Sequence, residues 1–126
     1  MVTWILWALI LAMLAWMGFN YLRIRRAAKI VDNEKFEALI RTGQLIDLRD
    51  PAEFHRKHIL GARNIPSSQL KTSLAALRKD KPVLLYENQR AQRVTNAALY
   101  LKKQGFSEIY ILSYGLDSWK GKVKTS

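Results

Sequence analysis

The residues with the clearest potential for chemistry form a polar loop behind an apolar run. Val83–Tyr86 is entirely apolar apart from the tyrosine hydroxyl, and a helix-like stretch that ends near Gln104 follows the loop. A buried strand that leads through a short loop into a helix builds an anion-binding site, because the free amides and the helix dipole point at the loop. The seven residues of this predicted binding loop are Glu87, Asn88, Gln89, Arg90, Ala91, Gln92 and Arg93.

The chain contains no cysteine, which limits what such a loop does. Disulfides, thiolate metal sites and a sulfur relay within the chain are excluded. Thiol chemistry needs a sulfur that the site activates, whereas Glu87 brings a negative charge and cannot carry a persulfide. Two interpretations stay open. In the first, the Glu87 carboxylate occupies the anion-binding site, accepts hydrogen bonds from loop amides and pairs with Arg90 or Arg93. In the second, Glu87 is an exposed residue with no partner.

Other side chains have supporting roles in this interpretation. Arg90 and Arg93 recognise phosphate or carboxylate groups if they face a ligand, and are solvated side chains if they do not. We expect Asp47 and Arg49 to form a pair that steadies the loop, and His58 to make a hydrogen bond that holds the fold. Two aromatic side chains lie after the last predicted strand, Tyr114 and Trp119. They either form a patch beside the loop or pack in the core. No His, Asp and Glu set has a metal-ligand spacing, so we expect neither a metal nor a cofactor.

The rest of the chain alternates short apolar runs with helical patterns. Strands are predicted at 29–31, 45–48, 61–65, 83–86 and 109–112, and helices at 33–41, 51–54, 67–77 and from the loop to 104, with a short one carrying Trp119. This alternation predicts an α/β domain with a five-stranded, mainly parallel sheet flanked by helices.

The first 22 residues carry no charge. At about 1.5 Å per residue they span roughly 33 Å, enough to cross a hydrocarbon core. A cleaved signal peptide is disfavoured because a basic start and a small-x-small cleavage site are missing. A buried core helix is disfavoured because the run is apolar on every face. We therefore predict a transmembrane anchor at 1–22, a basic juxtamembrane linker at 23–28 and one domain at 29–126.

The basic residues next to the apolar run predict its orientation. Arg23, Arg25, Arg26 and Lys29 follow the run, and no Lys or Arg precedes it. The positive-inside rule places the N-terminus outside the cell and the domain in the cytoplasm. The same residues are candidates for contact with anionic lipid headgroups. The formal charge of +11 alone does not indicate nucleic-acid binding, because the other basic residues are scattered and form no aromatic-interleaved stripe.

A long motif, LIDLRDPAEFHRKHILGARNIPSSQL at Leu45–Leu70, resembles the first half of a rhodanese domain. The matching positions are Asp47, Arg49, Glu53, Phe54, His58, Ile59, Gly61, Ala62, Asn64, Ile65 and Pro66. The second half matches in its order of strand, loop, helix and strand, followed by Gly115-x-x-x-Trp119. The resemblance covers about residues 29–122 and extends to membrane-anchored, single-domain rhodanese-like proteins of Gram-positive bacteria. It implies the rhodanese fold.

The departures from the family pattern concern the loop. Rhodaneses carry a catalytic cysteine directly after the fourth strand, where this chain has Glu87, or Asn88 when counted back from the helix. Five residues separate Glu87 from Arg93, against the usual four, a spacing similar to that of the related dual-specificity phosphatases. Lys57 stands where the family often has glycine before His58, and Tyr114 replaces the first of two paired glycines.

These observations favour a membrane-anchored, catalytically inactive rhodanese-like domain that binds or scaffolds a protein partner or a small anion on the cytoplasmic face. One alternative is an enzyme in which Glu87 acts as a base or nucleophile, although three nearby arginines are expected to lower the pKa of that carboxyl group. Another is a sulfurtransferase subunit that borrows a cysteine from a partner. The oligomeric state stays open.

Overall fold

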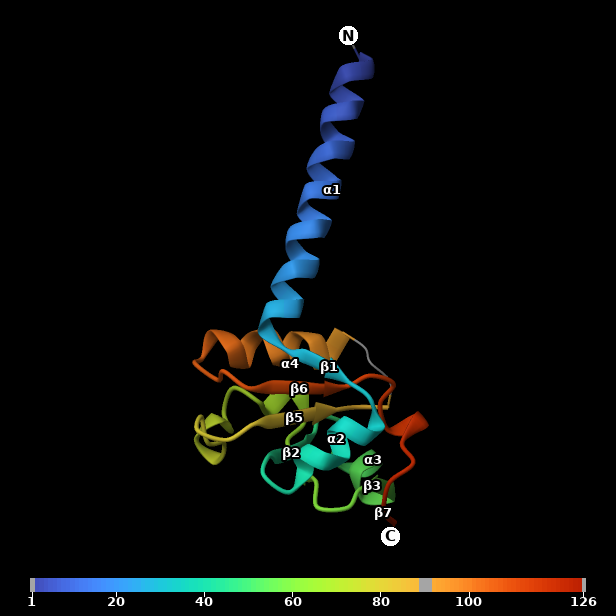
Figure 1. The fold of residues 1–126 in the computed structure, drawn as a ribbon, viewed down its shortest axis with the longest axis vertical. Coiled ribbons are helices and arrows are strands. Elements are labelled where there is room, and N and C mark those ends of the chain that lie inside the picture. Colours follow the sequence, from blue (N-terminus) through green and yellow to red (C-terminus); the bar gives the residue numbers. More distant parts are fainter. Residues whose placement is uncertain (1, 89–91, 126) are drawn as a thin grey trace.

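A computed structural model describes residues 2–88 and 92–125, with the backbone alone for residues 23–27. The helix α1 (Val2–Ala27) projects by itself from an α/β domain (Figure 1). Its segment Val2–Leu22 has a mean hydropathy of 2.0 and is not buried anywhere in the structure. Its length and composition suit a membrane span, as predicted. Residues 23–27, expected in a linker, continue α1 as helix.

The central sheet contains five parallel strands, which confirms the predicted fold class. In spatial order they are β1 (Lys29–Val31), β6 (Ile109–Leu112), β5 (Val83–Tyr86), β2 (Gln44–Asp47) and β4 (Arg63–Asn64). All four residues of β5 are buried, as expected for a central parallel strand covered on both faces. The register sets Asp47 of β2 beside Tyr86 of β5. The segments that follow these two residues therefore leave the sheet side by side.

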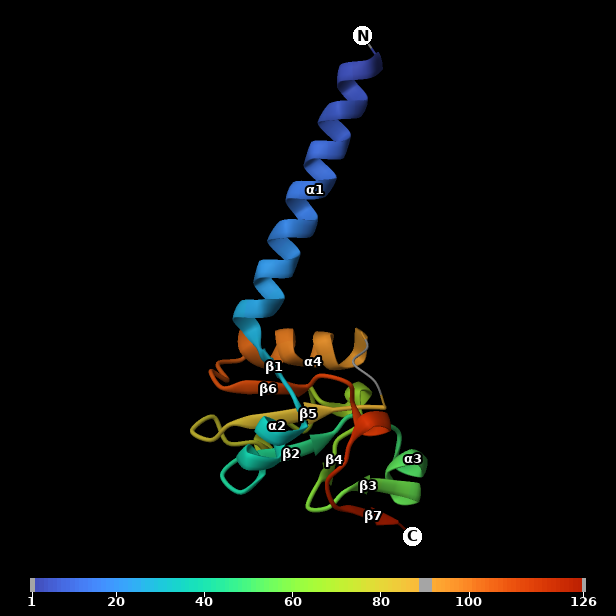
Figure 2. The same ribbon diagram turned by 45° about the vertical axis from the view of Figure 1, so that its right-hand side comes forward.

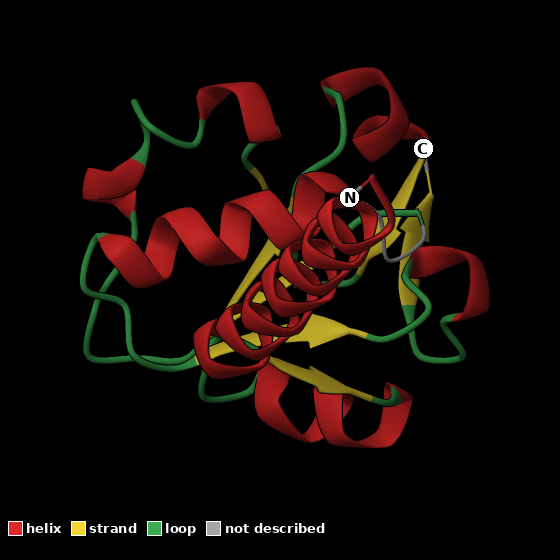
Figure 3. Ribbon diagram, turned by 90° about the horizontal axis from the view of Figure 1, so that it is seen from above, coloured by secondary structure: helices red, strands yellow, loops and turns green. Residues whose placement is uncertain are grey.

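Helices cover both faces of the sheet. On one face α4 (Gln92–Lys103) buries Val94, Ala97, Ala98 and Leu101. On the other face α2 (Asn33–Ile40) buries Phe36, and Asp32 caps α2 by accepting the Lys35 N–H at 2.9 Å. The short helix α3 (Pro51–Arg56) lies at the end of the domain away from α1 (Figures 1 and 2). In the view from above, α1 projects beside α4 (Figure 3).

Two predicted elements are wrong. The helix expected over 67–77 is replaced by two separate 3-10 turns, η1 (Ser67–Gln69) and η2 (Leu74–Ala76). Between them the Thr72 hydroxyl donates to the Gln69 carbonyl at 2.9 Å, a local bond of the kind that competes with helix formation. In the stretch 61–65 only β4 is a strand, and Gly61 two residues before it adopts a left-handed φ of 91°. A further antiparallel pair, β3 (Lys57–Ile59) and β7 (Val123–Thr125), was not anticipated.

Candidate functional site

Glu87 is the residue that follows β5, and its side chain points inward. Only 8% of the residue is exposed, and Oε2 accepts the Val94 N–H at 2.9 Å. Val94 is the third residue of α4, so its amide is one of the donors that a helix leaves without an intrahelical partner. The carboxylate therefore caps α4, as a side chain at the N-cap position would. The alternative of an exposed, unpartnered Glu87 is wrong.

The environment of Glu87 favours its neutral form. Burial raises the pKa of the Glu87 carboxyl group, and the Val94 N–H and the charge of Arg93 oppose this only in part. The expectation that nearby arginines lower this pKa is therefore wrong, because the loss of hydration outweighs their attraction. Arg93 is exposed and forms no ion pair with Glu87 in the part of the chain that the structure describes. Gln89, Arg90 and Ala91 lie outside the described residues.

The backbone of the loop is clamped to the turn η3 (Leu116–Ser118). The Glu87 carbonyl accepts the Leu116 N–H at 2.8 Å, and the Asn88 carbonyl accepts the Asp117 N–H at 3.0 Å. The absence of a side chain at Gly115 allows the Glu87 and Asn88 carbonyls to come this close to η3. A Cβ atom there would lie 2.4 Å from the Asn88 oxygen and 2.5 Å from the Glu87 oxygen, and its φ is 70°.

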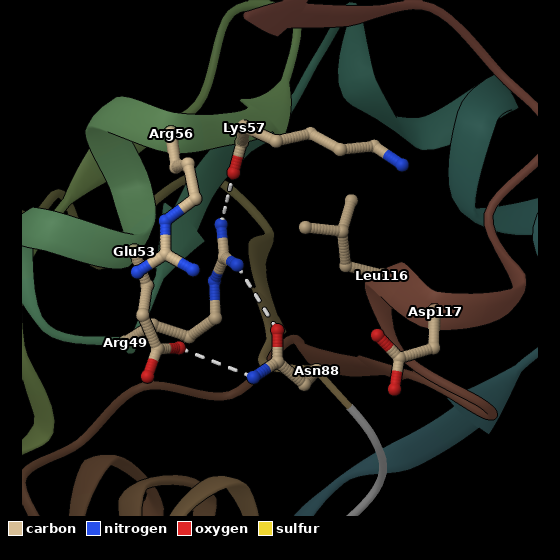
Figure 4. Close-up of a pocket in the computed structure, with 7 residues that line it drawn as sticks. All are labelled: Arg49, Glu53, Arg56, Lys57, Asn88, Leu116 and Asp117. Carbon is tan, nitrogen blue, oxygen red and sulfur yellow. Dashed lines mark hydrogen bonds between the residues drawn. The ribbon is translucent and has the colours of Figure 1, made fainter.

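Asp47 and Arg49 form the expected pair, and it reaches the loop. Arg49 Nη2 lies 2.8 Å from Asp47 Oδ2, and both side chains are buried. Burial works against the charge of Arg49, but the hydrogen bond and the attraction of Asp47 outweigh it and raise the pKa of Arg49. Arg49 also donates from Nη1 to Asn88 Oδ1 at 3.0 Å, and Asn88 Nδ2 donates to Glu53 Oε2 at 3.1 Å (Figure 4). Arg49 donates further to the Lys57 carbonyl. The Asn88 side chain is thereby held from both ends.

An open cleft of about 270 Å³ lies beside this network. Its lining carries charges of both signs and one apolar side chain: Arg49, Glu53, Arg56, Lys57, Asn88, Leu116 and Asp117 (Figure 4). Glu87 is not among the lining residues. The sequence reasoning identified Arg49 and Asn88 as site residues but missed the contribution of Glu53, Arg56, Lys57, Leu116 and Asp117. Nothing in their spacing indicates it, because three chain segments meet at the cleft.

The remaining predicted residues lie in supporting positions. His58 Nδ1 is 2.7 Å from the Phe54 carbonyl, and the two rings stack with centroids 3.8 Å apart, which ties β3 to α3. Trp119 packs edge-on against Phe36 with centroids 5.9 Å apart, whereas Tyr114 is 71% exposed. Trp119 thus belongs to the packing of the α2 side. Gln92 donates along α4 to Asn96 at 2.8 Å. The described residues contain no group of three or more His, Cys, Asp or Glu arranged to hold a metal ion.

The family model for the rhodanese-like domain matches residues 32–122. The chain belongs to the rhodanese-like family. It is 47% identical over 113 residues to the Bacillus subtilis protein YqhL, which covers 90% of this chain and 89% of that protein. It is 36% identical over 95 residues to the thiosulfate sulfurtransferase GlpE of Stutzerimonas stutzeri, covering 73% of this chain and 84% of that protein.

Solved structures agree with this rhodanese-like fold. A full-length protein from Lactobacillus plantarum superposes with a TM-score of 0.71 at 23% identity, covering 91% of this chain and 98% of that one. A rhodanese-related protein from Thermoplasma volcanium superposes with a TM-score of 0.70 at 23% identity, covering 78% and 99%. The protein thus contains a rhodanese-like domain without cysteine, and the side chain of Glu87, which follows the central strand β5, points toward the interior of the domain.

Proposed function

We propose that this protein is a membrane-anchored rhodanese-like module that does not transfer sulfur and instead binds a partner protein. The main support for the proposal is that the buried Glu87 carboxylate accepts a hydrogen bond from the Val94 amide. A thiosulfate anion would have to displace a carboxylate from that amide, and no thiol is present in the chain to receive its sulfur. A role for Glu87 as a catalytic base is not proposed, because its carboxylate caps α4 and does not line the cleft.

The cleft beside the loop is the proposed binding surface. Its volume of about 270 Å³ lies below the roughly 300–1,000 Å³ that is usual for pockets that enclose a small molecule. It is suited to one or two side chains of a larger partner. Arg56 and Lys57 are exposed on its wall and form no ion pair within the described part of the chain. The proposed partner is therefore a protein segment that presents a carboxylate to these two residues.

The proposed location is the cell membrane, with α1 as a single span and the domain in the cytoplasm. The support is the exposed, apolar segment Val2–Leu22, together with the basic residues after it. Because the chain has no cysteine, a single introduced one reports the topology. With Thr125→Cys, a membrane-impermeant maleimide should label the protein only after the cells are permeabilised. Labelling in intact cells would contradict the cytoplasmic assignment.

The absence of sulfur transfer is tested with the full chain in detergent, in a thiosulfate–cyanide assay. We expect no turnover by the wild type. We also expect none by Glu87→Cys, because a thiol there would still sit in a loop one residue longer than usual and on an inward-pointing side chain. Turnover by the wild type would overturn the proposal. Turnover by Glu87→Cys alone would show that the cradle still admits the anion.

Partner binding is tested by quantitative co-purification from membranes through the anchor. The double variant Arg56→Glu/Lys57→Glu reverses the charge of the cleft wall. Lys122→Glu/Lys124→Glu is the matched control, with the same change in charge on exposed residues outside the cleft. We expect proteins that bind the wild type and the control to be depleted at least fivefold with the cleft variant. If the same proteins were recovered in equal amounts with all three chains, the cleft would not be a binding surface.

A further inference from the structure

The junction between α1 and the domain is short and buried. Only Ala28 separates α1, which ends at Ala27, from β1, which begins at Lys29. Ala28 is 5% exposed and belongs to the same core cluster as Val94, Ala97, Ala98 and Leu101 of α4. The α1 helix also contacts α4, and α4 lies crosswise at the end of the domain next to α1 (Figures 1 and 2). The α4 end of the domain is therefore held next to α1.

The flanks of α4 are distinguished by their neighbours. Tyr100 lies on the flank that meets the segment after η1, since Lys71 Nζ sits 5.6 Å from the centre of its ring. At about 100° per residue, Lys102 projects from nearly the opposite flank, and Lys103 points directly away from the buried face. Both lysines are exposed. They share the α1 end of the domain with Lys29, the exposed first residue of the edge strand β1.

Acidic side chains are distributed unevenly between the two ends of the domain. No acidic residue occurs in α4, and the nearest acid after it is Glu108, in front of β6. Acidic side chains gather instead on α2 and α3, which lie farther from α1 (Figures 1 and 2): Glu34, Glu37 and Glu53. The end next to α1 thus presents lysines, and in the sequence Arg23, Arg25 and Arg26 directly precede this end.

We propose that Lys29, Lys102 and Lys103 rest on anionic lipid headgroups of the bilayer that α1 spans. The inference rests on the membrane anchoring proposed above. A basic residue close to an anionic surface favours contact by roughly fivefold, so the three lysines of a domain already tethered by α1 shift its population strongly toward the surface. In this orientation α3, with the Arg56 and Lys57 wall of the cleft, faces away from the membrane and toward soluble partners.

The test uses the full chain in lipid nanodiscs that contain a nitroxide-labelled headgroup lipid. One set holds phosphatidylcholine alone, and the other adds about one third phosphatidylglycerol. The readout is the paramagnetic broadening of backbone amides at 29, 102 and 103 relative to those at 122–125. We expect this ratio to be at least about twofold higher in the anionic discs. Raising NaCl from 0.1 M to 1 M should remove the difference, because the screening length falls from about 10 Å to about 3 Å.

Two charge-matched variants make the result specific. Lys102→Gln/Lys103→Gln should lose most of the dependence on anionic lipid, the remainder coming from Lys29, and Lys122→Gln/Lys124→Gln should keep it in full. Equal broadening in both lipids, or equal loss in both variants, would overturn this inference while leaving the anchor intact. Failure of the wild type to stay with the discs after an alkaline wash would overturn the membrane anchor and this inference together.

Discussion

Two substitutions of Glu87 separate the contribution of its charge to stability from that of its capping hydrogen bond to α4. Glu87→Gln keeps a side-chain oxygen that accepts the Val94 N–H, and removes the charge. Glu87→Ala removes both. Val94 is fully buried, so its amide is left without an acceptor in the alanine variant, which costs about 1–3 kcal/mol of the free energy of unfolding. The glutamine variant should stay within about 1 kcal/mol of the wild type, because the attraction of the helix N-terminus for the lost charge is only about 0.3–1 kcal/mol and burial of that charge acts in the opposite direction.

The dependence on pH sharpens this prediction. Burial raises the pKa of Glu87 above its ordinary value of 4.5, so in the window above that value the folded chain binds more protons than the unfolded chain. The contribution of Glu87 to stability is then complete below the ordinary pKa and falls as pH rises through the raised pKa. Glu87→Gln does not titrate. Its free energy of unfolding relative to the wild type should therefore increase from pH 4 to pH 7.

The measurement is denaturant-dependent hydrogen exchange of peptides from β5 and β6, followed by mass spectrometry of the full chain in detergent. These peptides report on the domain and leave α1 out of the signal. If Glu87→Gln were as destabilised at pH 7 as Glu87→Ala, the negative charge itself would hold the loop and the argument from burial would be refuted. If Glu87→Ala matched the wild type, the capping bond would contribute nothing.

The same exchange measurement checks two further predictions. Gly115→Ala should lower the free energy of unfolding of the domain by at least about 1–3 kcal/mol, because its φ of 70° and ψ of −168° lie in a region that only glycine tolerates. A Cβ atom there would also clash with the Asn88 carbonyl. Wild-type stability of this variant would contradict the close contact between the loop and η3. Asp47→Ala should cost about 3–5 kcal/mol by leaving the Arg49 charge buried and unpaired. Asp80→Ala, which breaks the exposed pair with Arg78, serves as its control and should leave stability unchanged within error.

Much of the fold was predictable because it depends on short-range patterns. Val83–Tyr86 is apolar apart from the tyrosine hydroxyl and forms the central strand β5, and the helix expected from residue 33 is α2. The failures lie where local and tertiary preferences compete. The stretch 67–77 has good helix formers, yet the Thr72 hydroxyl forms a local bond and the stretch closes into two turns. The β3–β7 pair joins segments more than sixty residues apart, so neither strand is evident from its own few residues.

The site shows the same division. The sequence alone determines that a rhodanese-like domain follows an apolar helix and that no thiol is present, because residue identities and their periodicity suffice for both. Only the tertiary structure decides that the Glu87 carboxylate turns inward to the Val94 amide, since that requires the loop, α4 and η3 to meet. The direction of its pKa depends likewise on burial by those elements, which outweighs the arginines visible in the sequence. The cleft walls come from three segments whose proximity no spacing along the chain records.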